Sequence, residues 1–178
     1  EKGIMGACFS FQATGIDGYL SSTNQGEGLL VDNTTNVEGK DYTSLQHHWD
    51  EAFGYFGAPT TFTNLTTDGA KFHAKYSLKG ESAGLNITND IMKAFYLGRK
   101  AINENNLDEA KKQAAIVKEK WELAIVASAI HYLNSGKTNF TSNVNRLHLL
   151  SEARAFIWSL NFNDDKKISS TQINEVLN

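Results

Sequence analysis

A histidine, a glutamate and a tyrosine recur at helical spacing in the stretch QHHWDEAFGYFG, residues 46–57. His48, Glu51 and Tyr55 are three and four residues apart, so on an α-helix their side chains meet along one flank. A neutral imidazole and a carboxylate at this spacing reach one cation, and a phenol beside them can orient a bound water or a ligand carboxylate. The pattern indicates a metal ion or a small polar ligand at the edge of a helix bundle.

The same helical periodicity gives the stretch an apolar sector and an outer face. The apolar sector contains Leu45, Trp49, Ala52, Phe53 and Phe56. Asp50 and Gly54 fall on the outer face, with His47 near its edge. A second interpretation is that His48 and Glu51 form only a hydrogen-bonded pair at a boundary between helices. Since zinc takes three or four ligands and iron takes more, a metal site would need further donors from elsewhere in the chain.

The remaining histidines are the candidates for those further donors. His131 lies in the apolar run AIVASAIHYL, where it is expected in a groove between helices, as a further ligand or as a satisfied core histidine. His73 lies in a long loop, where it is a mobile ligand or has no role. His148 and Glu152 are spaced as a surface pair on a helix.

Hydrophobic periodicity predicts one all-α domain over the 178 residues. The expected helices span residues 1–22, 43–56, 88–103, 106–135, 144–160 and 170–177. Gly136 is expected to stop the longest of them, whose second half should be the most buried element. Two long irregular loops, 23–41 and 57–86, are rich in Gly, Asn and Thr, and loops of this length are often functional.

The stretch NFNDDKKIS, residues 161–169, has Asn161, Asn163 and Asp165 at the alternating positions of a calcium-binding loop. Such a loop also needs a glycine and a glutamate where this chain has Lys166 and Gln172. We therefore expect a turn between two helices in place of an EF-hand.

Composition excludes several functions. A net charge of -3 without a basic cluster argues against a nucleic-acid partner, and no apolar run reaches the roughly 18 residues that a membrane span needs. The single cysteine, Cys8, has no partner for an internal disulfide and is expected to be buried. The chain contains no HExxH, P-loop, GxGxxG, CxxC or nucleophile elbow, so hydrolase, kinase, dehydrogenase and redox functions lack positive support, and a metal-dependent peptidase is the weakest of three hypotheses.

Three runs of the sequence resemble a Bacteroidota family of lipoproteins that carries a domain of unknown function and is related to imelysin. The runs are VDNTTNVEGKDYTSLQHHWDEAFGYFGAPTTF, AIVASAIHYLNS and SEARAFIWSLNF. Imelysin-like proteins share a GxHxxE motif on a helix that ends at a glycine. His48 and Glu51 occupy the motif positions and Gly57 closes the helix, whereas Gln46 replaces the first glycine.

The resemblance implies an imelysin-like helical bundle and the C-terminal part of a longer exported lipoprotein, in agreement with a start inside an amphipathic pattern. It implies a periplasmic or outer-membrane surface location on an upstream lipid anchor, in an iron-uptake context. The leading hypothesis is a non-catalytic module that binds a metal ion, most often iron, or a haem-like ligand. His48 and Glu51 would bind it, with help from Tyr55 and His131. The alternative is a structural or interaction module whose long loops bind a surface protein or a glycan.

Overall fold

The computed structural model describes residues 1–63, 66–139 and 142–178. Every named element in these ranges is a helix, and their only strand-like pairing is an isolated bridge between Asn36 and Thr43. The predicted all-α class is confirmed.

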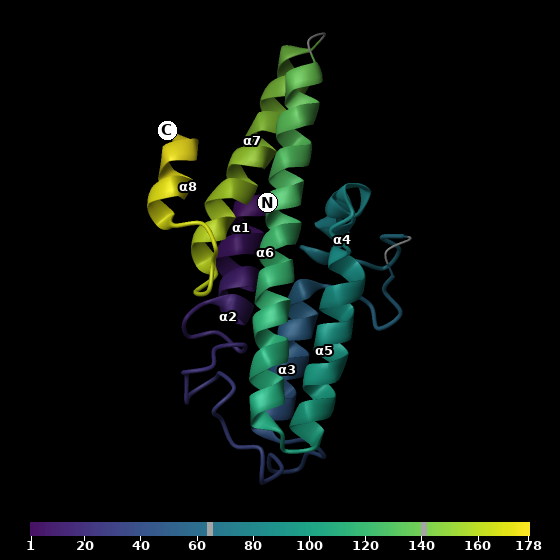
Figure 1. Cartoon of the computed structure of the whole chain (residues 1–178), viewed down its shortest axis with the longest axis vertical. Coiled ribbons are helices and arrows are strands. Elements are labelled where there is room, and N and C mark those ends of the chain that lie inside the picture. Colours follow the sequence, from purple (N-terminus) through teal and green to yellow (C-terminus); the bar gives the residue numbers. More distant parts are fainter. Residues whose placement is uncertain (64–65, 140–141) are drawn as a thin grey trace.

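The long helix α6 (Leu107–Thr138) runs through the middle of the molecule (Figure 1). Helices α5 (Ile87–Asn103) and α7 (Asn143–Ser159) pack along it, and both run antiparallel to it (Figure 1). Asn106 caps α6 at the start of the predicted range, because its side chain accepts a hydrogen bond from the Glu109 N–H at 3.1 Å. The buried side of α6 includes Ala114, Val117, Trp121 and Ile125.

The upper parts of α6 and α7 extend as a hairpin beyond the other helices (Figure 1). The predicted stop at Gly136 is wrong, because this buried glycine is a packing residue: a Cβ there would lie 2.9 Å from Leu150 Cδ2 of α7. The predicted burial of the second half of α6 is only partly correct. Ser128 is buried, whereas Ile130 in the hairpin is 52% exposed.

Helix α3 (Ser44–Phe56) lies against α5 and has well-defined ends. Thr43 and Gln46 form a capping box at its start, and Gly57 ends it with left-handed backbone (φ 90°), a conformation that glycine adopts without strain. The indole of Trp49 packs on the bare backbone of Gly98 in α5 and donates a 3.0 Å hydrogen bond to the carbonyl of Phe95. This contact fixes how α3 is rotated about its own axis.

The N-terminal helix is shorter than predicted. It comprises α1 (Lys2–Ile4), the π-helical segment η1 (Met5–Ser10) and α2 (Phe11–Thr14), and it ends where Gly15 becomes extended. The expected continuation to residue 22 is wrong because the chain turns back at Gly15 and Gly18. Their backbones approach the carbonyls of the preceding turn so closely that a Cβ would lie 2.6–2.7 Å from them.

Part of the predicted loop 57–86 is helical. Two short elements, α4 (Ala74–Ser77) and the 3₁₀ turn η2 (Leu78–Ala83), pack against α6. The polar sequence of this segment does not predict a helix, because it is the burial of Ala74 and Tyr76 in the tertiary structure that stabilises it. Residues 64–65 of the same loop lie outside the described ranges.

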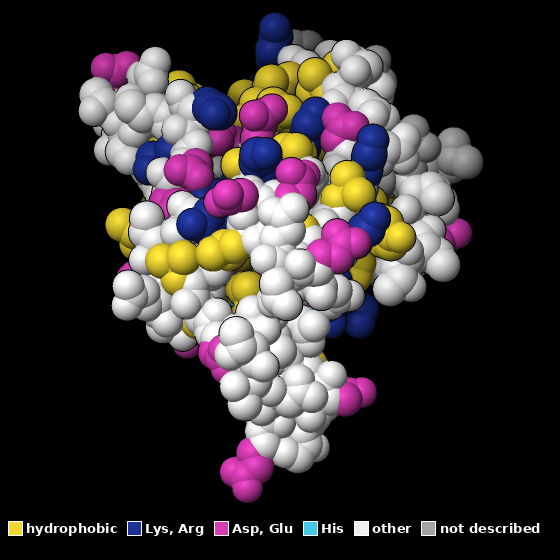
Figure 2. All heavy atoms as spheres, turned by 60° about the horizontal axis from the view of Figure 1, so that its bottom comes forward, with side chains coloured by type: hydrophobic (Ala, Val, Ile, Leu, Met, Phe, Trp, Pro, Cys, Tyr) yellow, Lys and Arg dark blue, Asp and Glu magenta, His cyan; other side chains and the backbone are white. Residues whose placement is uncertain are grey.

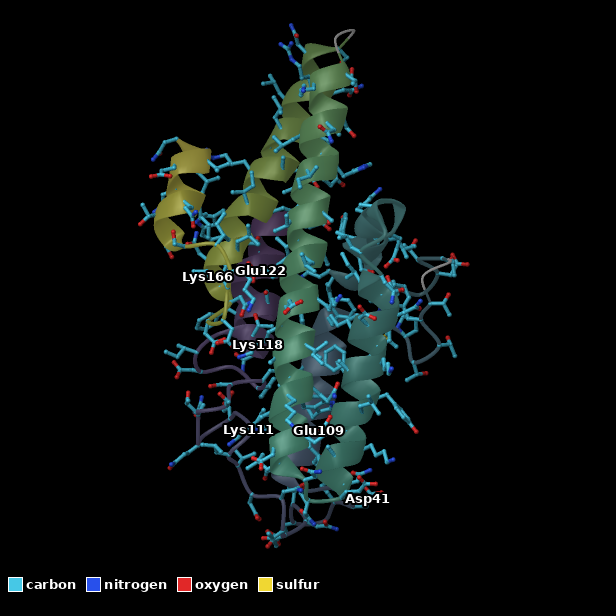
Figure 3. The ribbon with its side chains drawn as sticks, in the orientation of Figure 1. Asp41, Glu109, Lys111, Lys118, Glu122 and Lys166 are labelled. Carbon is cyan, nitrogen blue, oxygen red and sulfur yellow. The ribbon has the colours of Figure 1, made fainter. Side chains whose placement is uncertain are left out.

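The segment after α7 is a turn between helices, as predicted. It includes the 3₁₀ turn η3 (Leu160–Phe162) and leads into α8 (Ser170–Leu177). The buried Lys118 of α6 contacts Asp164 at 3.2 Å and also pairs with Asp165. One turn along α6, Glu122 accepts the Lys167 N–H at 2.9 Å (Figure 3). Asp165 of the calcium-like pattern and its neighbour Asp164 therefore balance a lysine ammonium group.

Charged side chains are mixed on the end of the bundle shown in Figure 2, where Lys and Arg alternate with Asp and Glu. Ion pairs also join charged side chains of different helices, such as Arg99 of α5 with Asp50 of α3 at 2.9 Å. Among the described residues, no helix is long and apolar enough to cross a membrane.

Two helix glycines should respond in opposite ways to alanine. At Gly98 a Cβ would lie 2.0 Å from the Trp49 ring, so we expect Gly98→Ala to lower the free energy of unfolding by about 1–3 kcal/mol. At Gly54 a Cβ meets nothing within 4 Å, so Gly54→Ala should raise it by roughly 0.5–1 kcal/mol. Urea unfolding followed by circular dichroism measures both. Equal effects at the two positions would contradict the packing of α3 on α5.

Candidate functional site

The stripe predicted on α3 faces the N-terminal helix. His48, Glu51 and Tyr55 are all half-buried, whereas Trp49 and Phe56 of the apolar sector are fully buried. The stripe therefore lines the boundary between α3 and the segment formed by η1, α2 and residues 15–22.

Tyr19 completes this stripe, and sequence reasoning missed it. Its ring centroid lies 4.9 Å from that of His48 and 6.0 Å from that of Tyr55. The predicted helix over residues 1–22 would have carried Tyr19 away from α3. The turn at Gly15 and Gly18 instead brings it back, and a 2.9 Å hydrogen bond from the Tyr19 N–H to the Gln12 carbonyl holds it there. No local sequence signal marks a contact between segments so far apart.

The imidazole of His48 is held in one tautomer by the backbone. Its Nδ1 lies 2.7 Å from the carbonyl oxygen of Glu27, and a carbonyl can only accept a hydrogen bond. Nδ1 therefore carries the proton, and Nε2 of the neutral ring keeps its lone pair. Metal-binding histidines commonly have this arrangement, with one nitrogen donating to a carbonyl and the other free to bind.

The sequence predicts that Glu51 shares a cation with His48 or forms a hydrogen bond with it, but its nearest charged partner is a different histidine. Its carboxylate lies 3.9 Å from Nε2 of His47, one turn earlier on the exposed side of α3. The hydrogen bond of His48 goes instead to Glu27, so Glu51 does not fix the His48 tautomer. The Glu51 carboxylate still acts on the stripe, because it is one of the groups that influence the Tyr19 phenol.

Burial and negative charge raise the pKa of Tyr19. Burial is the largest cause, and the neighbouring Glu27, Tyr55 and Glu51 add to it. Tyr19 is therefore protonated at neutral pH when no cation is near. One imidazole, two phenols and two carboxyl groups meet in this cluster, which we call the tyrosine–histidine cluster: Tyr19, Glu27, His48, Glu51 and Tyr55.

The structure does not bring His131 to the cluster. His131 lies on the exposed part of α6 and lines a separate hollow of about 480 Å³ with Lys79 and Asn134. Burial and the charge of Lys79 lower its pKa. Of the four predicted ligands, three are therefore on one stripe and the fourth is elsewhere.

In the described part of the chain, no three side chains from His, Cys, Asp and Glu lie close enough together to hold a metal ion. A metal at the tyrosine–histidine cluster would have to use phenol oxygens as well. The donor set of the cluster, imidazole nitrogen with carboxylate and phenolate oxygens, matches iron better than zinc, which favours nitrogen and sulfur.

Cys8 and the His148–Glu152 pair differ from what the sequence predicts. Cys8 is exposed, so the predicted burial is wrong. Glu152 does not pair with His148; its carboxylate lies 3.4 Å from Nζ of the buried Lys2. Tertiary packing of α1 on α7 makes this contact, which the i, i+4 spacing does not reveal.

His73 is the most unusual histidine. It is 0% exposed and packs beside Trp121 and Phe156, with ring centroids 5.7 and 6.4 Å away. Within the described residues, neither of its ring nitrogens has a hydrogen-bond partner, and the same is true of Trp121 Nε1. Burial lowers the pKa of His73 to about 3. His73 is thus a neutral core residue, and its loop is not free at this point.

Comparisons with known proteins identify a family and no characterised relative. A family model described as "Domain of unknown function (DUF4856)" matches residues 1–178, the whole length of the chain. A search of curated proteins and a search of solved structures each found no match. The geometry of the molecule is therefore the main guide to its function.

His73 should make folding sensitive to acid. Its pKa is about 3 in the folded protein and 6.5 when unfolded, so the unfolded chain binds more protons between these values. Stability is therefore lost as the pH falls below 6.5. From pH 8 to pH 5, wild type should lose about 2 kcal/mol more unfolding free energy than His73→Phe.

Urea unfolding at the two pH values measures this difference. The matched control is His148→Phe, which replaces an exposed histidine and should keep the wild-type pH dependence. If His73→Phe also kept it, His73 would not be a buried neutral group.

Proposed function

We propose that this chain, which belongs to the family described as Domain of unknown function (DUF4856), is a non-catalytic module that binds iron at the tyrosine–histidine cluster. The observation that supports this most is the position of Tyr19 between His48 and Tyr55. It adds a potential ligand from a second segment to the stripe on α3.

The chemistry of the side chains favours ferric iron. Fe³⁺ is a hard cation that binds carboxylate and phenolate oxygens and accepts imidazole nitrogen. Nε2 of His48 already has the lone pair that a metal needs, because Glu27 holds the proton on Nδ1. Glu51 provides a carboxylate on the same stripe. Iron within a haem-like group is the related possibility, with His48 as an axial ligand.

The charges around Tyr19 would make iron binding depend on pH. The raised pKa of Tyr19 reflects an environment in which a further negative charge is unfavourable. A bound cation reverses this, since its own charge stabilises a phenolate beside it. Iron binding would therefore displace protons and weaken as the pH falls.

The cellular setting that we propose follows from the resemblance to imelysin. It is export to the periplasm or the outer-membrane surface on a lipid anchor, with a role in iron uptake. Support comes from α3, where His48 and Glu51 precede the helix-ending Gly57 in the order of the imelysin motif. Gln46, which replaces the motif glycine, has a structural role here: its Oε1 accepts the Thr43 N–H at 3.0 Å and completes the capping box.

A second candidate function is recognition of a protein or glycan by the loop 23–41. This loop is anchored to two helices. Asn33 Nδ2 donates to the Ile102 carbonyl at 2.8 Å and to Asn105 Oδ1 at 2.7 Å, and the Glu27 carbonyl accepts a hydrogen bond from His48 Nδ1. An anchored loop offers a preorganised surface, which lowers the entropy lost on binding. In this case the tyrosine–histidine cluster would only pack α3 against its neighbours.

Titration with ferric citrate separates the two functions. Wild type should retain iron by elemental analysis and show the visible absorption of a phenolate–iron bond. Tyr19→Phe removes one oxygen without a change in volume, and we expect the affinity for iron to fall by about tenfold or more. His48→Ala combined with Glu51→Ala should abolish binding, and the wild-type affinity should decrease at acid pH.

The matched control is Tyr96→Phe, which removes the same oxygen from a tyrosine of α5 that is 71% exposed. It should bind iron as wild type does. If wild type retained no iron and the double variant were only less stable, the packing interpretation would replace the binding one.

A further inference from the structure

A second hollow lies on the other side of the stripe, open to solvent. It has a volume of about 280 Å³. Its lining consists of Phe9, Asp50, Glu51, Gly54, Tyr55 and Phe72. It shares Glu51 and Tyr55 with the tyrosine–histidine cluster but contains neither Tyr19 nor His48.

Gly54 is unfavourable for the helix that contains it. A glycine inside a helix costs roughly 1 kcal/mol relative to alanine. Close packing usually explains such a residue, as it does at Gly98, but a Cβ on Gly54 would meet nothing within 4 Å. The absence of a side chain has one visible effect, which is to leave the hollow open.

The backbone is also irregular at two of the aromatic walls. Phe9 belongs to the π-helical segment η1, and π-helical turns occur frequently at functional sites. Phe72 has left-handed backbone (φ 45°), an outlier for a bulky residue. Gly57 packs closely beside it: its carbonyl accepts the Lys71 N–H at 2.8 Å, and a Cβ on Gly57 would lie 2.6 Å from the Lys71 carbonyl oxygen. Strained backbone of this kind persists where the surroundings enforce it, often at ligand sites.

The lining combines aromatic rings with negative charge. The ring of Phe9 lies 4.2 Å from that of Phe72 and 5.7 Å from that of Tyr55, measured between centroids, so the three form one aromatic wall. Asp50 and Glu51 stand at its edge. Arg99 balances Asp50 at 2.9 Å, whereas Glu51 has only the imidazole of His47 at 3.9 Å. The hollow therefore retains negative charge beside aromatic faces.

We propose that this hollow binds a small organic cation, an alkylammonium or guanidinium group, against the rings of Phe9, Tyr55 and Phe72. Aromatic faces attract such cations, and a carboxylate adds a charged hydrogen-bond acceptor. The volume is slightly below that of pockets for drug-sized ligands, which suits a group of this size. The cation belongs to a free amine or to a Lys or Arg side chain of a partner protein. This proposal does not depend on iron binding.

The test is a titration of ¹⁵N-labelled protein with n-butylammonium and n-butylguanidinium at constant ionic strength, followed by amide NMR shifts. Saturable shifts should appear at Glu51, Gly54 and Tyr55. The neutral n-butanol, which has the same chain, should produce no saturable shift at these amides. Equal responses to n-butanol and n-butylammonium would overturn the proposal.

A variant that fills the hollow provides a second test of the proposal. Gly54→Leu places a side chain in the hollow and improves helix propensity, so the fold should be retained while affinity for n-butylammonium falls by about tenfold or more. Ala115→Leu, at an exposed position of α6, is the matched control and should bind as wild type does. Undiminished binding by Gly54→Leu would also overturn the proposal.

Two further arms identify the source of the cation and separate this site from the iron site. Binding of N-acetyl-lysine methylamide as tightly as n-butylammonium supports a partner side chain, whereas binding of the free amine alone supports a small metabolite. His48→Ala should lose affinity for iron but keep the n-butylammonium shifts. Loss of both together would contradict two separate sites.

Discussion

The contact between Trp49 and Gly98 determines which side of α3 faces the N-terminal segment. The indole occupies space that any side chain at residue 98 would need, and its N–H is satisfied by the Phe95 carbonyl. The ring of Phe95 also meets those of Trp49, Phe53 and Phe56 at 5.2–6.1 Å between centroids. α3 is thereby held at one rotation. Since a helix turns by about 100° per residue, that rotation directs His48 toward the N-terminal segment and Gly54 toward solvent.

The buried polar groups that join the C-terminal turn to α6 have ion-pair or hydrogen-bond partners within the protein. Lys118 is buried but contacts two carboxylates, and Glu122 accepts a backbone N–H although burial raises its pKa. These groups fasten the C-terminal turn to α6 (Figure 3). The tyrosine–histidine cluster is different, because Glu27 holds the proton of His48 on Nδ1 and Tyr19 lies close to carboxylates that disfavour its ionisation. The buried ion pairs stabilise the fold, and the cluster is where we propose that a ligand binds.

The sequence was informative where the structure depends on local patterns. The ends of α3, its apolar sector, the Asn106 cap and the turn at residues 161–169 all follow from periodicity and capping. It was uninformative where distant segments meet. Tyr19 reaches His48 only after a turn at two glycines, and His73 is buried only because α6 and α7 cover it. The expected helix end at Gly136 is instead, like Gly98, a point of close helix packing.

We propose that one rotation of α3 places Trp49 in the core and His48 at an iron site. Anomalous diffraction at the iron absorption edge, from crystals soaked in ferric citrate, tests this most directly. We expect one strong peak between Tyr19 and α3, about 2 Å from His48 Nε2 and from oxygens of Glu51 and the two tyrosines. A peak only at the distant His131, or no ordered peak in crystals of the folded protein, would contradict the claim.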